Sequence, residues 1–335
     1  MEETRIAVIA IVVEDREQVN TMNEILHDYG KYILKRLAIG ILTLFILATI
    51  TFFLMHAIPG SPFGADNKNL TPEQYAAMQA KYNLDKPLFQ QYTTYMVNLL
   101  HMDFGESISK KGELVLDIIL KRAPVTARLG ACAFIISVVA GITLGIVGAL
   151  TKKKWVNGFI TFLATLGVSL PSFIVAILLM IFLGVKLKIF PLLGLSTPAS
   201  YVLPTIALSI GPIAMVTRLT RSSLKDVMNK DYIILARSKG TDDVKVIIKH
   251  ALRNALLPVI TYCGPLLAGL VTGSFVVETL FTIPGIGKEF TSSVTNRDYP
   301  MIMGLTIFLG AIVILMQLAS DIVAAIVDPR IKVKS

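Results

Sequence analysis

Long apolar runs recur along this chain and constrain its fold more than any other feature. The first, residues 38–58, holds no acidic or basic side chain except His56 near its end. A run of about 20 apolar residues is long enough to cross a bilayer. Inside lipid the backbone must satisfy its own hydrogen bonds, so each run is expected to be a helix. The later runs are residues 129–150, 158–185, 201–217, 257–280 and 301–323. We therefore predict an all-α polytopic membrane protein with six transmembrane helices.

Composition agrees with this class. Hydrophobic residues make up 54% of the 335 residues and charged residues only 16%, whereas soluble domains carry about 25% charged residues. The net charge of +9 is best explained by lysines and arginines kept on the cytoplasmic side. No basic patch with interleaved aromatic residues indicates binding of nucleic acid. The lysines at 152–154 and the basic tail after Asp328 predict that both termini are cytoplasmic.

Residues 1–30 differ from the rest. The β-branched run at residues 5–13 is too short to span a bilayer and predicts a strand. Asp15 and Gln18 form a capping-box pattern for a following helix. This β-α pair resembles the first half of a small ferredoxin-like (ACT-like) regulatory domain. We treat residues 1–30 as an extension whose origin is open, either a genuine appended element or a fused start, and expect little function from it.

The longest polar interval, residues 59–128, is predicted to be an extracytoplasmic loop. Residues 70–82 are expected to form a short amphipathic helix capped by Thr71. The loop is either an ordinary cap over the helices or a contact for a substrate-binding protein, and both roles are compatible.

Motifs for chemistry are absent from the sequence. No G-x-x-x-x-G-K-[ST] phosphate loop occurs, and no G-x-S-x-G nucleophile motif. The four histidines are scattered and the two cysteines lie in apolar segments, so neither a metal site nor a disulfide is expected. Glu278, Arg218 and Asp321 fall near span boundaries, whereas proton-coupled transporters need carboxylates within the membrane. We expect neither an enzyme nor a bound cofactor.

A basic, polar island at residues 218–257 separates two apolar runs. Its apolar residues predict two helices, one with Val227, Ile234 and Leu235 on a face, the other with a stripe from Val244 to Ala255. Gly240 is expected to end the first helix, and Thr241 or Asp242 to cap the second. Such a loop is either a solvated connection or a docking surface for a partner.

Several motifs resemble those of one family. Ala236 and Gly240 match the second Ala and the Gly of the EAA loop of importer-type ABC permeases, although Ile234 and Leu235 replace its Glu and first Ala. Leu252 falls within the later apolar-Pro element. The segments DKPL at 85–88, DFGES at 103–107, VVETLFTIPGIG at 276–287, RDYP at 297–300 and DPR at 328–330 resemble the oligopeptide, dipeptide and nickel branch, specifically its B-type permease subunit, over residues 31–335.

This resemblance implies a type I ABC importer permease fold in the plasma or inner membrane of a prokaryote. It implies four kinds of partner besides the lipid bilayer: a homologous C-type permease, two cytoplasmic ABC ATPases that bind the ATP, and an extracytoplasmic solute-binding protein. Di- and oligopeptides are the expected solutes, and nickel chelates or oligosaccharides are the alternatives. Two other classes stay open, an ion-gradient-driven secondary transporter and a membrane anchor for a regulatory complex.

The resemblance also assigns candidate site residues, while the residues that line the solute path stay unidentified. The candidates for the ATPase-coupling loop are Asp231, Ala236, Lys239, Gly240, Thr241 and Leu252. The candidates for the extracytoplasmic motif are Glu278, Pro284, Gly285, Gly287, Arg297, Asp298 and Tyr299.

Overall fold

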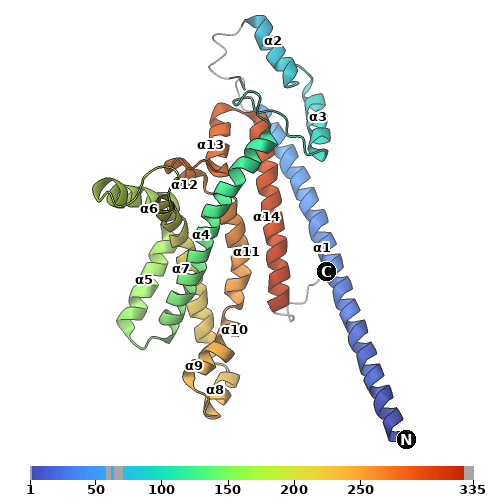
Figure 1. The fold of residues 1–335 in the computed structure, drawn as a ribbon, viewed down its shortest axis with the longest axis vertical. Helices are drawn as coiled ribbons and strands as arrows, with labels where there is room; N and C mark the ends of the chain where they lie inside the picture. Colours follow the sequence, from blue (N-terminus) through green and yellow to red (C-terminus); the bar gives the residue numbers. More distant parts are fainter. Residues whose placement is uncertain (1, 58–61, 64–70, 328–335) are drawn as a thin grey trace.

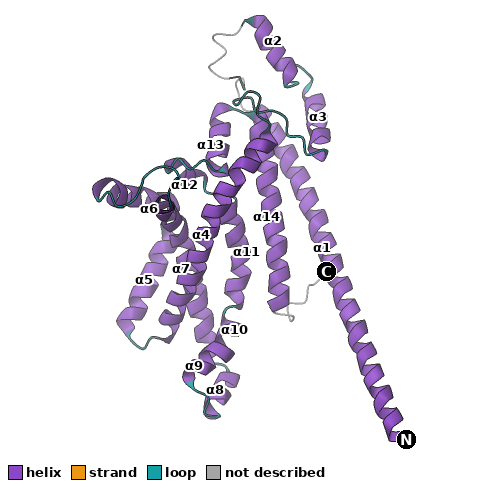
Figure 2. Cartoon of the chain, in the orientation of Figure 1, coloured by secondary structure: helices purple, strands orange, loops and turns teal. Residues whose placement is uncertain are grey.

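The computed structural model describes residues 2–57, 62–63 and 71–327, and their side chains over residues 30–57, 62–63 and 71–323. This part of the chain is helical and contains no strand, only an isolated bridge between Glu106 and Leu114 (Figure 2). The predicted all-α class is confirmed. The DPR tail, which was predicted to be cytoplasmic, lies outside the described residues.

Figure 1 shows most of the helices side by side along one axis. They are α1 (Glu2–Ala57), α2 (Pro72–Lys81), α3 (Leu88–Leu100), α4 (Val115–Leu150), α5 (Lys154–Ser169), α6 (Ser172–Leu179), η2 (Met180–Lys186), η3 (Pro198–Tyr201), α7 (Val202–Met228), α8 (Asp231–Ser238), α9 (Asp243–Lys245), η4 (Val246–Ala251), α10 (Leu252–Ala255), α11 (Leu257–Val271), α12 (Phe275–Leu280), α13 (Ile286–Asn296) and α14 (Tyr299–Val327).

Within the described residues, five helical stretches are long and apolar enough to cross a membrane, and a sixth results if the bent pair of α5 with α6 and η2 counts as one span. The chain bends by 104° between the two halves of this pair. The bend lies at Pro171. Leu170 and Pro171 both have extended backbone, with ψ of 121° and 138°. Leu170 is extended because a proline disfavours helical backbone at the residue before it.

The strand predicted at residues 5–13 is wrong, because α1 runs without a break from Glu2 to Ala57. A lone strand leaves its backbone groups unpaired and is not stable by itself, and the described part of the chain offers no strand to pair with it. A helix satisfies those groups internally. The capping box predicted at Asp15 and Gln18 therefore falls inside a helix and not at its start.

The helices also extend beyond the predicted spans. α4 begins at Val115, so the predicted extracytoplasmic loop at 59–128 contains α2, α3 and the first turns of α4. At about 1.5 Å per residue, α4 is longer than the hydrocarbon layer of about 30 Å, and it projects past it. α7 likewise takes the first part of the predicted coupling loop. The predicted cap at Thr71 is confirmed, since Thr71 and Gln74 form a capping box at the start of α2.

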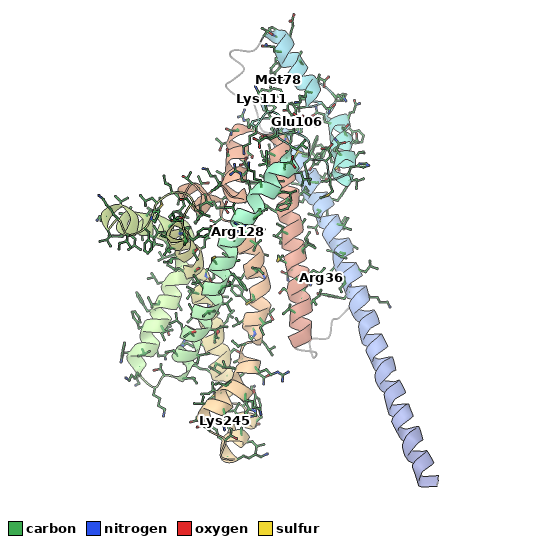
Figure 3. The ribbon with its side chains drawn as sticks, in the orientation of Figure 1. Arg36, Met78, Glu106, Lys111, Arg128 and Lys245 are labelled. Atoms are coloured by element: carbon green, nitrogen blue, oxygen red, sulfur yellow. The ribbon has the colours of Figure 1, made fainter. Side chains whose placement is uncertain are left out.

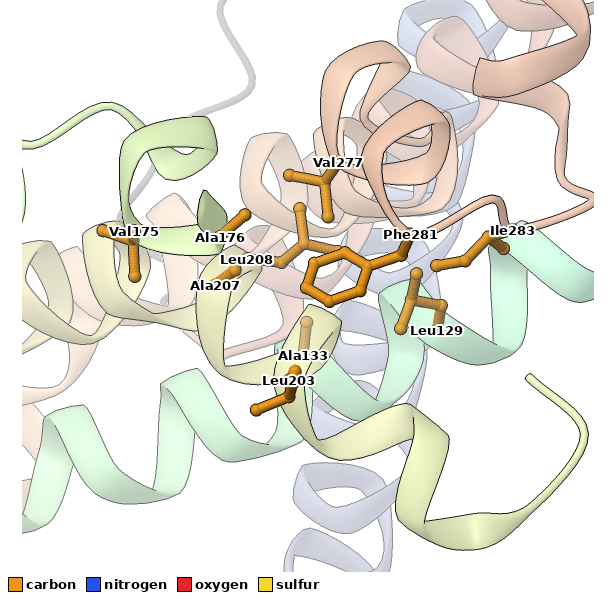
Figure 4. Packing of buried hydrophobic residues seen from close by; sticks show 10 residues of the cluster. All are labelled: Leu129, Ala133, Val175, Ala176, Leu203, Ala207, Leu208, Val277, Phe281 and Ile283. Carbon is orange, nitrogen blue, oxygen red and sulfur yellow. The ribbon is translucent and has the colours of Figure 1, made fainter. Parts of the chain in front are cut away.

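The centre of the bundle is the contact between α4 and α7. Two glycines of α4 let the helices approach closely: a Cβ at Gly141 would lie 2.6 Å from the Cβ of Val216, and one at Gly145 would lie 2.5 Å from the Cβ of Thr220. Small residues at this spacing allow tight helix packing in membranes. At one end of this contact a buried cluster that includes Leu129, Ala133 and Phe281 joins α4 and α7 to α6 and α12 (Figure 4).

α1 is attached along α14 (Figure 1). Asp321 of α14 accepts a hydrogen bond from the Tyr32 hydroxyl at 2.9 Å and pairs with the Arg36 guanidinium at 2.9 Å. Arg36, labelled in Figure 3, also donates to Tyr32 at 3.0 Å. The three side chains satisfy one another, so a charged pair is tolerated between two apolar helices.

We expect Gly145→Ala to destabilise the protein relative to Gly158→Ala. The added methyl group at Gly145 would meet Thr220 and the carbonyl oxygen of Thr217, whereas a Cβ at Gly158 has no neighbour within 4 Å. Overpacking of this kind costs about 1–3 kcal/mol, while Ala in an open helical position gains about 0.5–1 kcal/mol over Gly. Thermal unfolding in detergent measures the difference. Equal unfolding temperatures for the two variants would contradict the close contact of α4 with α7.

Candidate functional site

The turn between α8 and α9 has the geometry predicted from Gly240. This glycine has φ of +77°, and its N–H donates to the carbonyl of Arg237 at 2.9 Å. The N–H of Thr241 donates to the carbonyl of Ala236 at 3.3 Å, which closes α8 in a left-handed cap. Asp242 then caps the next helix by accepting from the N–H of Val244 at 3.1 Å. Of the two predicted caps, Asp242 is the one used.

The inner face of this loop is fixed to the bundle. Ile233, Val246, Ala251 and Ala255 are buried against Leu224 and Val227 at the end of α7. Partly buried residues at the end of α4 complete this cluster, and Ala236 packs against it as well. The helices α8 to α10 are therefore a rigid projection from the ends of α4 and α7, at the opposite end of the bundle from α13 (Figure 1).

The outer face of the loop presents apolar side chains to solvent. We call this surface the coupling patch; it consists of Tyr232, Ile234, Leu235, Val244 and Ile248, with exposures from 42% to 64%. The predicted faces of the two helices are wrong. Ile234 and Leu235 were expected beside Val227, and Val244 and Ile248 beside Ala251. Val227 and Ala251 are buried, whereas the other four side chains are exposed. The chain turns between α7 and α8, and η4 is a π-helix, whose wider turn shifts the register of the side chains.

The predicted coupling residues are thus brought together around one turn. Asp231 begins α8 and is exposed, and Lys239 is exposed beside Gly240. Leu252 starts α10 and is partly buried. Lys245, labelled in Figure 3, is exposed on the same projection.

At the opposite end, a buried carboxylate joins α4 to α12 and α13. Glu278 has no exposed surface. Its Oε1 accepts from the Thr126 hydroxyl at 3.1 Å, and its Oε2 from the N–H of Lys288 at 3.2 Å. Thr126 Oγ1 in turn accepts from the N–H of Ile286 at 2.8 Å. A buried carboxylate is tolerated only when hydrogen bonds replace its water, so these donors are required. We call this set of contacts the Glu278 staple.

Glycines surround the staple closely. A Cβ at Gly285 would overlap Glu278 Oε2 and Thr126 Oγ1, and one at Gly287 would lie 3.0 Å from the carboxyl carbon of Glu278. The predicted residues Glu278, Gly285 and Gly287 therefore converge. Pro284 lies between them, and its carbonyl accepts from Arg122 Nη1 at 3.3 Å.

A second buried carboxylate connects two motifs that are distant in sequence. Asp298, 1% exposed, accepts from the Ser107 hydroxyl and from the N–H groups of Ile108 at 3.1 Å and Ser109 at 3.0 Å. It also caps α14 by accepting from the N–H of Met301 at 3.2 Å. The RDYP segment is thereby bound to the end of the DFGES segment.

The neighbours of Asp298 have structural positions of their own. Arg297 adopts a left-handed conformation with φ of +56° and ends α13. Tyr299 is buried against Met55 and Ile302, and its ring centroid lies 5.3 Å from that of His56. All three predicted residues of this segment therefore shape the junction of α13, α14 and α1.

Several polar residues that hold this end together were not predicted. Thr126 acts through partners far away in the sequence, and no local pattern distinguishes it. Ser107 ends the DFGES segment, but its bond to Asp298 joins positions 191 residues apart. Glu289 forms an ion pair with Lys110 and lies 3.6 Å from Arg122 Nε. Its one sequence signal is its place in the first turn of α13, where an acidic residue complements the helix dipole.

Residues 141–333 match a family described as "Binding-protein-dependent transport system inner membrane component", and residues 30–130 match the N-terminal part of the same kind of protein. The first match alone covers more than half of the chain. The chain belongs to this family. The permease is 44% identical over 302 residues to a dipeptide transport system permease of Lactococcus lactis, a match that covers 90% of this chain and 99% of the relative.

Other relatives agree. An oligopeptide transport system permease of Escherichia coli is 41% identical over 305 residues, again with 90% of this chain and 99% of the relative covered. The permease is therefore a multi-pass membrane protein whose relatives are transport subunits. A short match at residues 5–43 is to a family described as "Iron-only hydrogenase system regulator, putative". The division of the chain near residue 31 stays a prediction.

Among solved structures, the permease resembles the MetNI methionine ABC transporter in an inward-facing conformation. The TM-score is 0.51 at 17% identity, and the match covers 64% of this chain and 97% of that one. At this identity the likeness concerns the fold alone, and it confirms the predicted type I importer permease fold.

We expect Asp298→Asn to destabilise the permease, whereas Asp85→Asn should have little effect. The amide NH₂ of Asn would face an N–H or hydroxyl donor that now points at a carboxylate oxygen. Loss of hydrogen bonds to a buried charged group costs about 1.5–3 kcal/mol each. Asp85 is exposed and serves as the matched control. Thermal unfolding in detergent gives the comparison, and an unchanged Asp298 variant would argue against the buried network.

Proposed function

We propose that this permease is the transmembrane subunit of an ATP-driven, binding-protein-dependent importer of di- and oligopeptides. The observation that carries this proposal is the identity of 41–44% with dipeptide and oligopeptide permeases along 99% of their length. Nickel chelates and oligosaccharides are the alternative solutes. Selectivity among them also depends on the solute-binding protein, a separate chain.

The coupling patch fits an ATPase partner. Exposed apolar side chains on a charged, rigid projection are typical of a protein interaction surface. We assign this surface to one of two cytoplasmic ATPases, which bind the ATP, so that this chain needs neither a catalytic site nor a cofactor. A homologous C-type permease completes the membrane part of the importer, and an extracytoplasmic protein delivers the solute.

The orientation follows from charge. Lys152, Lys153 and Lys154 lie at the connection of α4 with α5, at the same end as the coupling patch (Figure 1). An excess of lysine and arginine marks the cytoplasmic side. On this assignment both termini are cytoplasmic, and α2, α3, α13 and the Glu278 staple are extracytoplasmic.

A continuous path of packed residues then connects the two ends. Movement of the ATPases would displace α8, whose Ile233 packs on Leu224 of α7. α7 is closely packed along α4 through the contacts at Gly141 and Gly145. α4 in turn holds α12 and α13 through Thr126. Closure of the ATPases would therefore tilt α4 and α7 together and change the opening at the extracytoplasmic end.

We expect Gly240→Asp to abolish ATP-driven uptake while the protein stays in the membrane. A side chain at φ of +77° strains the turn, at about 1–3 kcal/mol, and distorts the loop beside the coupling patch. Gly112→Asp is the matched control, because Gly112 has φ of +84° and a similarly open surrounding, but lies at the other end of the bundle. The measurements are uptake into vesicles and co-purification of the ATPases.

The co-purification distinguishes the classes of transporter. A second permease and P-loop ATPases that are lost with Gly240→Asp but kept with Gly112→Asp would support the importer. A protein purified without any ATPase, which still transports solute along an ion gradient, would contradict it.

We expect removal of residues 2–29 to leave uptake nearly intact. The matches to the transport permease family begin at residue 30, and the contacts of α1 with α14 described above start at Tyr32. Uptake and membrane insertion of the truncated chain are compared with those of the full chain. Loss of a regulatory response together with unimpaired assembly of the importer would instead favour a role of this segment as a regulatory anchor.

A further inference from the structure

A cavity of about 730 Å³ opens at the end of the bundle that carries the Glu278 staple. It lies between α4, the segment at residues 194–201 and the connection of α12 with α13. Its volume is within the range of about 300–1,000 Å³ that is usual for small-molecule sites. The side chains that matter for its chemistry are Arg122, Arg128, Tyr201, Pro284, Lys288 and Glu289.

The lining of this cavity is strongly basic. It contains three cations, Arg122, Arg128 and Lys288, and one carboxylate, Glu289. The charge of Glu289 is already neutralised by Lys110, which lies outside the lining, and by Arg122, whose Nε is 3.6 Å from Glu289 Oε2. The cavity therefore carries an uncompensated positive charge.

Two of the cations are available for a ligand. In the described part of the chain neither Arg128 nor Lys288 forms an ion pair or a side-chain hydrogen bond. Lys288 is held in place by its backbone N–H, which donates to Glu278, so its side chain is presented from a fixed position. Arg128, labelled in Figure 3, stands on α4 one turn past Pro124.

We propose that this cavity receives the carboxylate end of a peptide solute at the extracytoplasmic mouth, with Arg128 and Lys288 as its charged contacts. The proposal rests on the function proposed above and adds the residues that recognise the solute. A guanidinium offers paired N–H donors that match the two oxygens of a carboxylate, and an ammonium adds a compact positive charge.

The remaining walls fit a peptide of variable sequence. Tyr201 supplies a hydroxyl, and Val125, Leu195 and Pro284 supply apolar contacts for the last side chain. Every peptide with a free end presents the same carboxylate, whatever its side chains. A site that reads this group can therefore accept many peptides and still exclude a solute of the same size without the charge.

The test uses the complete importer, reconstituted in vesicles with its ATPases, partner permease and solute-binding protein. Uptake of one tripeptide with a free carboxylate is compared with uptake of its C-terminal amide. The variants are Arg128→Gln, Lys288→Gln and Lys288→Arg, and Lys111→Gln is the control, an exposed lysine at the same end that does not line the cavity. All variants are measured with the same binding protein. Its own preference between the two peptides is therefore the same in every variant and cancels when the variants are compared.

We expect the preference for the free carboxylate over the amide to fall roughly tenfold or more with each Gln variant, as for the loss of one charge-assisted contact. Lys288→Arg should keep most of the preference, because it keeps the positive charge at this position. Lys111→Gln should match the wild type. An unchanged preference in both Gln variants would overturn the proposal.

A second result would also overturn it. In the Gln variants, uptake of both peptides could slow equally while the binding protein no longer stimulates ATP hydrolysis. The cations would then bind an acidic surface of that protein and not the solute. If the wild-type importer takes up neither peptide, the proposed peptide function itself fails, and the carboxylate site fails with it.

Discussion

The arrangement of the α13 end depends on a carboxylate that has been taken out of water. Glu278 is completely buried and has no cation within salt-bridge distance among the described residues. Transfer of an unpaired carboxylate into an apolar surrounding is so unfavourable that donors must replace the lost water. The donors come from α4 and from the first turn of α13. The positions of α4 and α13 are therefore fixed by the hydrogen bonds that Glu278 needs. Glycines are required beside Glu278 because a larger residue would overlap its carboxylate.

The same helix, α4, takes part in both ends of the molecule. Thr126 lies in the Glu278 staple, whereas Ile146, Ala149 and Leu150 pack against the cluster beneath α8 to α10. Between them, Gly141 and Gly145 bring α4 against α7 with no space for a further methyl group. Close-packed interiors transmit displacement because they have little free volume. α4 and α7 are accordingly the elements best placed to couple the coupling patch to the opposite end.

The sequence predicted what local patterns determine. Run length predicted the spans, Gly240 predicted the turn after α8, and Thr71 predicted the cap of α2. The sequence did not predict features that depend on contacts between residues far apart in the chain. Glu278 and Thr126 are separated by 152 positions, and no periodicity relates them. The π-helix η4 changed which apolar residues of the loop are buried, and the strand expected near the N-terminus has no partner strand among the described residues.

The cationic cavity and the Glu278 staple share Lys288, so they cannot be independent. Lys288 lines the cavity with its side chain while its N–H holds Glu278, and Arg122 lines it while donating to the carbonyl of Pro284. A shift of α4 against α13 would change the distances among the cations and the strength of the staple together. Coupling between binding and conformation is reciprocal. An anion that binds one arrangement of these helices more tightly must therefore favour that arrangement by the same factor, which would connect the arrival of solute to the conformation of the permease.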